Sequence, residues 1–225
     1  MMMQCMCKRV VCFDLDDTLY KEIDFLKSGY RKVAELVEKR FHYDAREVYD
    51  KLYSWYNHGE NPFARLNGYY GLDNPIEDYL NVYRYHLPTI MLADGVEDVL
   101  NELAYRGVII GMITDGRTIS QKNKINALNL ERWLDEKNII ISEDFGSEKT
   151  DEHNFTCFME SYPNGTYYYI GDNPKKDFLV PNRLGWQTVM LKDDGRNIHK
   201  QGAVPMEYLP QITINEFDEI LDIIR

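Results

Sequence analysis

The sequence is poor in cysteine and has no apolar run that approaches the length of a membrane span. Its four cysteines, at positions 5, 7, 12 and 157, show no repeated paired spacing, so we expect a reducing compartment and no disulfide framework. Cys5 and Cys7 could in principle ligate a metal, but no second Cys/His pair at zinc-site spacing completes a site, which favours a frayed N-terminus. The first nine residues do not resemble a secretory signal, so a cytoplasmic location is expected.

Positive charge is also scarce. Lysine and arginine together number 26 against 37 acidic residues, which gives a formal net charge of -11 and a pI near 4.9. Such a chain repels a nucleic-acid backbone and an anionic membrane surface, so neither is an expected partner. Its 225 residues, 44% hydrophobic and 28% charged, fit a soluble globular protein with one substantial α/β domain and an insertion, or two small domains.

Residues 20–90 have helical periodicity and no convincing strand. Apolar residues recur at steps of three and four from Ile23 to Val37, which predicts a helix of about four to five turns. Further helical stretches are expected over about 44–56 and 75–87, bounded by breaks that contain glycine and proline. The region therefore reads as an all-helical insertion.

Outside this insertion, short apolar runs alternate with helical patterns. The expected buried strands are 10–13, 108–113, 139–141, 167–170 and 186–191, and the expected helices between them include 96–103, 118–128, 151–161 and 174–185. This alternation predicts an α/β fold with a doubly wound parallel sheet. The core would comprise residues 1–19 and 91–225.

The chain is expected to end in a short helix. Phe217, Ile220, Leu221 and Ile224 lie on one side of it. The spacing of Thr213 and Glu216 suggests a capping box at its start.

Polar clusters follow three of the apolar runs directly. They are Asp14-x-Asp16, Thr114-Asp115-Gly116 and Gly171-Asp172. The carboxyl ends of parallel strands lie on one edge of a sheet, so these clusters are expected to converge there. Carboxylates packed together repel one another unless a cation, a ligand or a pKa shift compensates, which points to a functional site.

Together with Lys149, these three clusters resemble in order the four motifs of the haloacid dehalogenase-like superfamily, and the match spans residues 10–191. Asp14-x-Asp16-x-Thr18 resembles the first motif and Thr114 the second. Lys149 resembles the third, although Thr150 follows it where many relatives have proline. Gly171-Asp172 with Asp177 resembles the fourth. The resemblance implies a Rossmann-like core, with residues 20–90 as a helical cap that closes over the substrate.

The resemblance also implies how the carboxylates would work. Asp14 would be the nucleophile that forms an aspartyl-phosphate, and Asp16 the general acid and base. Asp14, Asp172 and the backbone carbonyl of Asp16 would hold Mg²⁺, which favours one or two carboxylates together with substrate and water.

The remaining motif residues would bind and orient. The hydroxyl of Thr114 and the backbone N–H groups of Asp115 and Gly116 would donate to phosphate oxygens. Lys149 would add a cation beside the nucleophile and the phosphate. Asp177 would orient Lys149 or a metal-bound water.

The resemblance thus predicts a magnesium-dependent phosphatase for a small phosphorylated metabolite, either a sugar phosphate or a nucleoside monophosphate. A phosphomutase keeps the same motifs and stays an alternative. A 2-haloacid dehalogenase lacks the second aspartate of the first motif, so Asp16 disfavours it. A non-catalytic binding protein on the same fold is the alternative outside enzymes, and the oligomeric state stays open.

Overall fold

The centre of the molecule is a parallel sheet. The structure is a computed structural model that describes residues 8–224, so Cys5 and Cys7 lie outside the described part. Six strands follow the order β3-β2-β1-β4-β5-β6, and every neighbouring pair is parallel. This confirms the predicted α/β fold with a doubly wound parallel sheet. The strands are β1 (Arg9–Phe13), β2 (Ile109–Thr114), β3 (Ile139–Ile141), β4 (Thr166–Gly171), β5 (Gln187–Leu191) and β6 (Ile212–Ile214).

The strand order reverses at β1. The chain moves from β1 outward to β2 and β3, and then returns to place β4 on the other side of β1. In open α/β sheets a crevice forms at such a reversal, outside the carboxyl ends of the two strands. The segments that follow β1 and β4 therefore meet at the position where ligands bind in this architecture.

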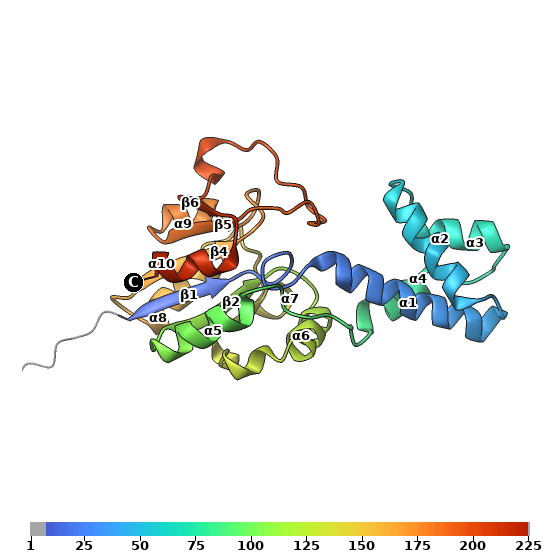
Figure 1. Ribbon diagram of the computed structural model, residues 1–225, viewed down its shortest axis with the longest axis horizontal. Helices are drawn as coiled ribbons and strands as arrows, with labels where there is room; N and C mark the ends of the chain where they lie inside the picture. The colour runs from blue at the N-terminus through green and yellow to red at the C-terminus, as the bar shows by residue number, and fades with distance from the viewer. Residues whose placement is uncertain (1–7, 225) are drawn as a thin grey trace, which may run out of the picture.

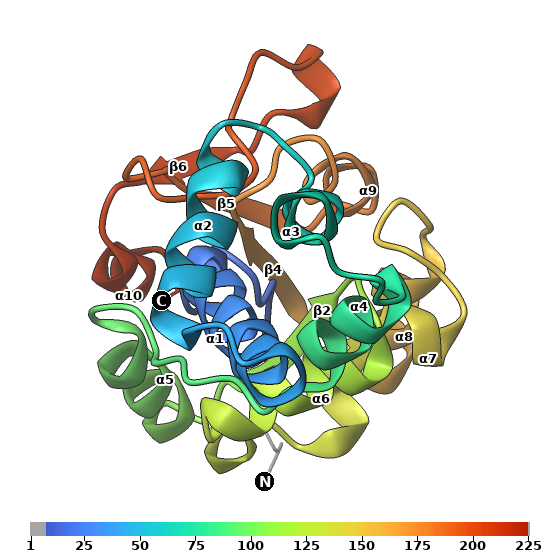
Figure 2. The same cartoon turned by 90° about the vertical axis from the view of Figure 1, so that its right-hand side faces the viewer.

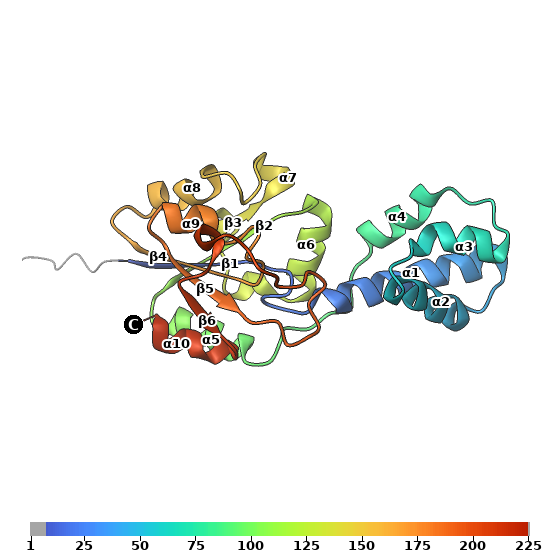
Figure 3. The same cartoon turned by 90° about the horizontal axis from the view of Figure 1, so that it is seen from above.

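The central strand is buried on both faces, because its side chains alternate between two hydrophobic clusters. Val11 and Phe13 belong to one cluster, and Val10 and Cys12 belong to the other. Figure 3 shows helices on both sides of the sheet, as the alternation of strands and helices predicts. They are α5 (Val96–Tyr105) and α10 (Ile220–Ile223) on one side, and α8 (His153–Ser161) and α9 (Leu179–Arg183) on the other.

Four helices form a separate group beyond the carboxyl ends of the strands (Figures 1 and 2). They are α1 (Glu22–Phe41), α2 (Ala45–Asn57), α3 (Pro62–Tyr70) and α4 (Ile76–Tyr85). The apolar stripe predicted for α1 is largely buried, with Leu26, Tyr30 and Val33 packed in a cluster of their own. The boundaries at residues 20 and 90, and the role of the group as a cap, remain predictions.

The predicted helix over residues 174–185 is wrong in its first half. Residues 174–178 form turns, and α9 starts only at Leu179. The carboxylate of Asp177 turns back to accept the backbone N–H groups of Asp172 and Asn173. These bonds fold the chain into a compact loop before the helix begins.

The predicted capping box of Thr213 and Glu216 is also wrong. Thr213 lies in β6, a strand that the sequence did not predict, and the capping box joins Glu216 to Glu219. The last helix is correspondingly short, a 3₁₀ turn over Phe217–Glu219 followed by α10. Within residues 8–224, no helix combines the length and the apolar character that crossing a bilayer requires.

Candidate active site

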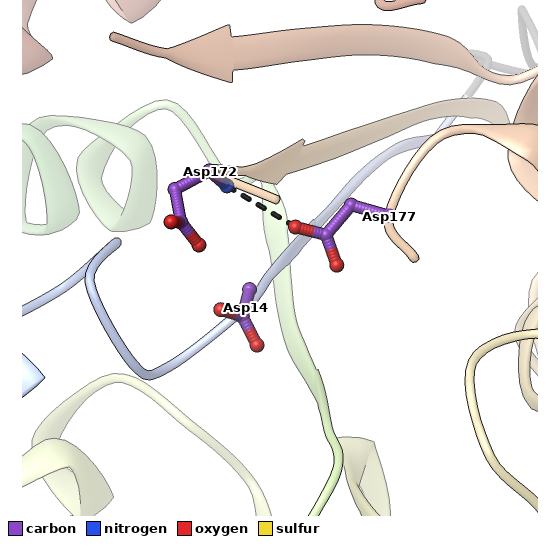
Figure 4. A group of neighbouring side chains, drawn as sticks. All are labelled: Asp14, Asp172 and Asp177. Atoms are coloured by element: carbon purple, nitrogen blue, oxygen red, sulfur yellow. Dashed lines mark hydrogen bonds between the residues drawn. The ribbon is translucent and has the colours of Figure 1, made fainter. Parts of the chain in front are cut away.

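Three buried carboxylates meet at the reversal of the sheet. Asp14 follows β1, and its N–H extends the strand pairing by donating to the carbonyl of Ile170 at 2.8 Å. Asp172 follows β4, and Asp177 returns to the same place from the loop before α9. One oxygen from each of these three side chains lies within 4.8 Å of the others, and Figure 4 shows the side chains around a common space. The predicted convergence of the first and fourth motifs is present in the structure.

Lys149 provides the positive charge in this cluster. Its side chain is buried, and its Nζ donates to the Oδ1 atoms of both Asp14 and Asp177, the latter at 2.9 Å. Burial alone would lower the pKa of the Lys149 ammonium, but the two carboxylates outweigh this effect and raise that pKa well above its usual value. Lys149 therefore remains positively charged, and its single charge offsets part of the negative charge of Asp14 and Asp177.

Asp177 is held between Lys149 and the backbone. While Oδ1 accepts from Lys149, Oδ2 accepts the N–H groups of Asp172 at 3.1 Å and Asn173 at 2.8 Å. Gly171 makes this possible, because a Cβ at that position would lie only 2.4 Å from Oδ2 of Asp177. The contacts suit the orienting role predicted for Asp177, which remains a prediction.

Asp172 is fixed by a loop that the sequence did not point to. Asn197 Nδ2 donates to Oδ2 of Asp172 at 2.8 Å, and Gln201 Nε2 donates to its backbone carbonyl at 2.7 Å. Lys21, next to the start of α1, donates to Oδ1 of Asn197 at 3.0 Å. Asn197 and Gln201 lie in a polar segment without periodicity, so the sequence carried no signal for them.

The side chain of Asp16 is not part of the carboxylate cluster. Its two oxygens accept from Lys124 Nζ at 2.7 and 2.9 Å, while Gln121 Nε2 donates to Oδ2 at 2.9 Å and the Tyr20 hydroxyl donates to Oδ1. Burial would raise the pKa of Asp16, but Lys124 and the other hydrogen bonds lower it below its ordinary value. The predicted metal contact of Asp16 through its backbone carbonyl remains a prediction.

The second motif borders the same space. Thr114 is buried at the end of β2, and its Oγ1 accepts from Gln121 Nε2 at 2.7 Å. The carboxylate of Asp115 accepts the backbone N–H of Lys149 at 3.0 Å, and the phosphate contact predicted for the backbone N–H of Asp115 remains a prediction. The N–H of Gly116, predicted to bind phosphate, donates to Ser142 Oγ at 3.0 Å. A phosphate at Gly116 would have to replace that bond.

A cavity of about 310 Å³ opens over these groups. This volume suits a small metabolite. Its lining carries both signs of charge: acidic side chains come from the loop after β1, from α1 and from the later loops, and the basic side chains come from the later loops. The lining residues are Asp14, Asp16, Asp17, Glu22, Asp115, Lys149, Asp172, Asn173, Lys175, Lys176, Asp177 and His199.

The donor set of the cluster fits a hard divalent cation. Lys149 binds Oδ1 of Asp14, whose Oδ2 accepts a long bond of 3.5 Å from the Thr18 hydroxyl, and Asn197 binds Oδ2 of Asp172. Oδ2 of Asp14 and Oδ1 of Asp172 are therefore the oxygens that suit a metal, and Mg²⁺ prefers one or two carboxylates completed by water and substrate oxygens. Asp177 is less suited as a ligand, because both of its oxygens accept hydrogen bonds from the protein.

Without a metal, this cluster should make stability depend on pH. Burial is the largest cause that raises the pKa of Asp14 to about 7, of Glu22 to about 8 and of Asp172 to about 9. The folded protein then binds more protons than the unfolded chain between about pH 4 and pH 9, so the unfolding free energy should fall as pH rises through this range. Urea denaturation in EDTA should therefore give a lower unfolding free energy at pH 8 than at pH 5.

Glu22→Gln provides the internal check on this pH dependence. The amide does not titrate, so this variant should lose part of the decrease between pH 5 and pH 8. An unfolding free energy that stays level or rises over this range in the metal-free wild type would contradict the assignment.

The fold and the site together define a class of protein. It has a doubly wound parallel sheet, acidic groups and a buried lysine at the reversal of strand order, and a helical group over the carboxyl edge. Residues 11–191 match the family model of haloacid dehalogenase-like hydrolases. The chain belongs to this family, as the four motifs suggested.

Relatives along nearly the whole chain are phosphatases. The chain is 27% identical over 230 residues to a glyceraldehyde 3-phosphate phosphatase of Methanocaldococcus jannaschii, with 96% of each chain covered. It is 26% identical over 226 residues to the N-acylneuraminate-9-phosphatase of Mus musculus, with 90% of this chain and 87% of the other covered. The predicted enzyme class, a phosphoric monoester hydrolase, is confirmed.

A solved structure shows the same architecture. The HAD-hydrolase YfnB from Bacillus subtilis, crystallised with magnesium bound, superposes with a TM-score of 0.65 at 19% identity. The superposition covers 97% of this chain and 99% of the other. At this level of identity, the likeness demonstrates the shared fold.

Proposed function

We propose that the protein is a magnesium-dependent phosphatase that hydrolyses a small phosphorylated metabolite through an aspartyl-phosphate on Asp14. The observation that carries this proposal is the cluster itself. The carboxylates of Asp14, Asp172 and Asp177 lie within 4.8 Å of one another, and Lys149 touches Asp14 and Asp177. Such a concentration of buried charge is unfavourable in a structural role, but it suits a site that receives a cation and a phosphate.

Each residue of the site has its own role in this mechanism. A carboxylate oxygen of Asp14 attacks phosphorus, so the new O–P bond forms as the ester O–P bond breaks. Asp16 must carry a proton when the substrate binds; it gives this proton to the leaving oxygen, and it then takes one from the water that hydrolyses the aspartyl-phosphate. Lys149 and the Thr114 hydroxyl donate to the phosphate oxygens. Mg²⁺ held by Asp14, Asp172 and the backbone carbonyl of Asp16 would supply the positive charge that offsets nucleophile and phosphate.

For the substrate, we favour a sugar phosphate over a nucleoside monophosphate. Both relatives take their names from phosphates of carbohydrate-type carbon chains. The cavity wall contributed by the first motif and α1 includes Asp16, Asp17 and Glu22. Glu22 can exchange hydrogen bonds with hydroxyl groups, and the negative charge of Asp16 and Asp17 disfavours a second phosphate on the substrate. Neutral polyhydroxylated leaving groups should therefore be preferred to bisphosphates.

Phosphate release from a panel of sugar phosphates, nucleoside monophosphates and p-nitrophenyl phosphate tests the proposal. With Mg²⁺ present we expect multiple turnovers on at least one sugar phosphate, and EDTA should abolish them because the charge on Asp14 and the phosphate is then uncompensated. Restoring Mg²⁺ should restore the rate. Turnover that survives EDTA would contradict the metal requirement, and the absence of any release across the panel would contradict the phosphatase.

A further inference from the structure

Two buried polar residues of α6 (Thr118–Ala127) point into the site without belonging to any of the four motifs. Gln121 and Lys124 lie one turn apart on this helix, and both are almost fully buried. Polar side chains are rarely buried to this extent unless they are paired. Their partners are residues of the first and second motifs.

Gln121 connects these two motifs. Its Nε2 lies 2.9 Å from Oδ2 of Asp16, 2.7 Å from Oγ1 of Thr114 and 3.1 Å from the backbone carbonyl of Asp115. Asp16 is the proposed proton-transfer group and Thr114 the proposed phosphate-binding hydroxyl. One amide group therefore fixes where the proton carrier lies relative to the position of the phosphate.

Lys124 holds the same carboxylate from a second direction. Its Nζ donates to both oxygens of Asp16, at 2.7 and 2.9 Å. With Gln121 on Oδ2 and the Tyr20 hydroxyl on Oδ1, each oxygen of Asp16 has two donors. A carboxylate bonded in this way has little freedom to rotate.

Helix α6 is itself held against the helical group. Lys124 Nζ lies 4.4 Å from the centroid of the Phe25 ring of α1. Ser120 Oγ donates to the carbonyl of Arg84 at 2.8 Å, and Asn123 Nδ2 donates to the carbonyls of Tyr85 and His86 at 3.2 and 3.1 Å. Packing of α6 on the first turn of α1 and on the end of α4 therefore fixes the positions of Gln121 and Lys124, as a preorganised site requires.

We propose that Gln121 and Lys124 are positioning residues that set the carboxylate of Asp16 for proton transfer to the leaving group. The inference rests on the proposed function, because it assigns to Asp16 the proton-transfer step of that mechanism. Neither residue touches the phosphate in this role. Both act through Asp16, and Gln121 also acts through Thr114.

The test compares two esters that differ in their need for a proton. p-Nitrophenolate leaves without protonation, whereas phenolate is a poorer leaving group that depends more on a general acid. In Gln121→Met, which keeps the length of the side chain but lacks the amide donor, kcat/KM for phenyl phosphate should fall at least about tenfold more than for p-nitrophenyl phosphate. Gln121→Asn, which is too short to reach Asp16, should show the same selective loss, and so should Lys124→Met.

A double-mutant cycle separates positioning from a general structural effect. In an Asp16→Asn background, Gln121→Met should produce no further change in the ratio of the two esters, because it acts through the removed carboxyl group. Lys124→Arg keeps the cation and should recover part of the phenyl phosphate rate. Lys122→Met is the matched control on the same helix, because Lys122 is exposed and pairs only loosely with Asp144 at 3.8 Å.

The outcomes distinguish failure of the positioning role from failure of the proposed phosphatase activity. If wild type hydrolyses both esters with Mg²⁺ but all three single variants lose both rates equally or neither rate, the positioning role is overturned and the phosphatase stands. If the ratio still changes in the Asp16→Asn background, the route through Asp16 is wrong. If wild type hydrolyses neither these esters nor the metabolite panel, both proposals fail together.

Discussion

Replacement of Asp14 by asparagine is expected to lower kcat by on the order of 10⁴-fold or more while the protein stays folded. The amide has nearly the shape of the carboxylate, but it is a far poorer nucleophile and a poorer ligand for a cation. The rest of the cluster remains in place, since Lys149 also binds Asp177 and the backbone still holds Asp177. Steady-state phosphate release measures the loss, and circular dichroism checks the fold.

Trapping the intermediate makes this prediction specific for the nucleophile. Borohydride reduces an aspartyl-phosphate to homoserine, so wild type quenched during turnover should yield a peptide with homoserine at position 14, and Asp14→Asn should not. Asp135→Asn is a suitable control, because the Asp135 side chain is 72% exposed and forms an ion pair with Lys137 at 3.6 Å, away from the site. Substantial turnover by purified Asp14→Asn, or homoserine at another position, would refute the role of Asp14.

The central strands and their carboxylates were predictable because local pattern and topology agree. An apolar run that ends in acids identifies both β1 and the position of Asp14, and Gly171-Asp172 does the same for β4. Parallel strands place their carboxyl ends on one edge, so convergence followed without knowledge of distances. Lys149 was predictable only by resemblance, because its loop has no pattern of its own. Its contacts with Asp14 and Asp177 required the structure.

The residues that support these groups could not be predicted from the sequence. Gln121 and Lys124 lie on a helix without an apolar stripe, where polar residues read as a solvated face, yet the site side of that helix is buried. Asn197 lies 25 positions from Asp172, in a polar loop. Pairs so distant in sequence depend on tertiary packing, which periodicity does not report. The signal that the sequence does offer is the acid Asp16, because a half-buried carboxylate requires a partner.

Replacement of Lys149 by methionine is expected to reduce both activity and stability. kcat should fall by about 10²–10³-fold or more, because a buried donor to the phosphate and the nucleophile is lost. In the metal-free protein the carboxylates of Asp14 and Asp177 would lose their shared cation. Removing one partner of a buried ion pair lowers the unfolding free energy by about 3–5 kcal/mol. Phosphate release and urea denaturation in EDTA measure the two effects.

The pH dependence of the destabilisation by Lys149→Met identifies its cause. Burial already raises the pKa of Asp14 to about 7 with Lys149 present, so at pH 5 the carboxyl group is mostly protonated and needs the cation less than at pH 8. The destabilisation by Lys149→Met should therefore be smaller at pH 5 than at pH 8. Lys137→Met, which removes a lysine that is 71% exposed, should change neither quantity. Equal destabilisation at both pH values would mean that Lys149 contributes packing rather than charge.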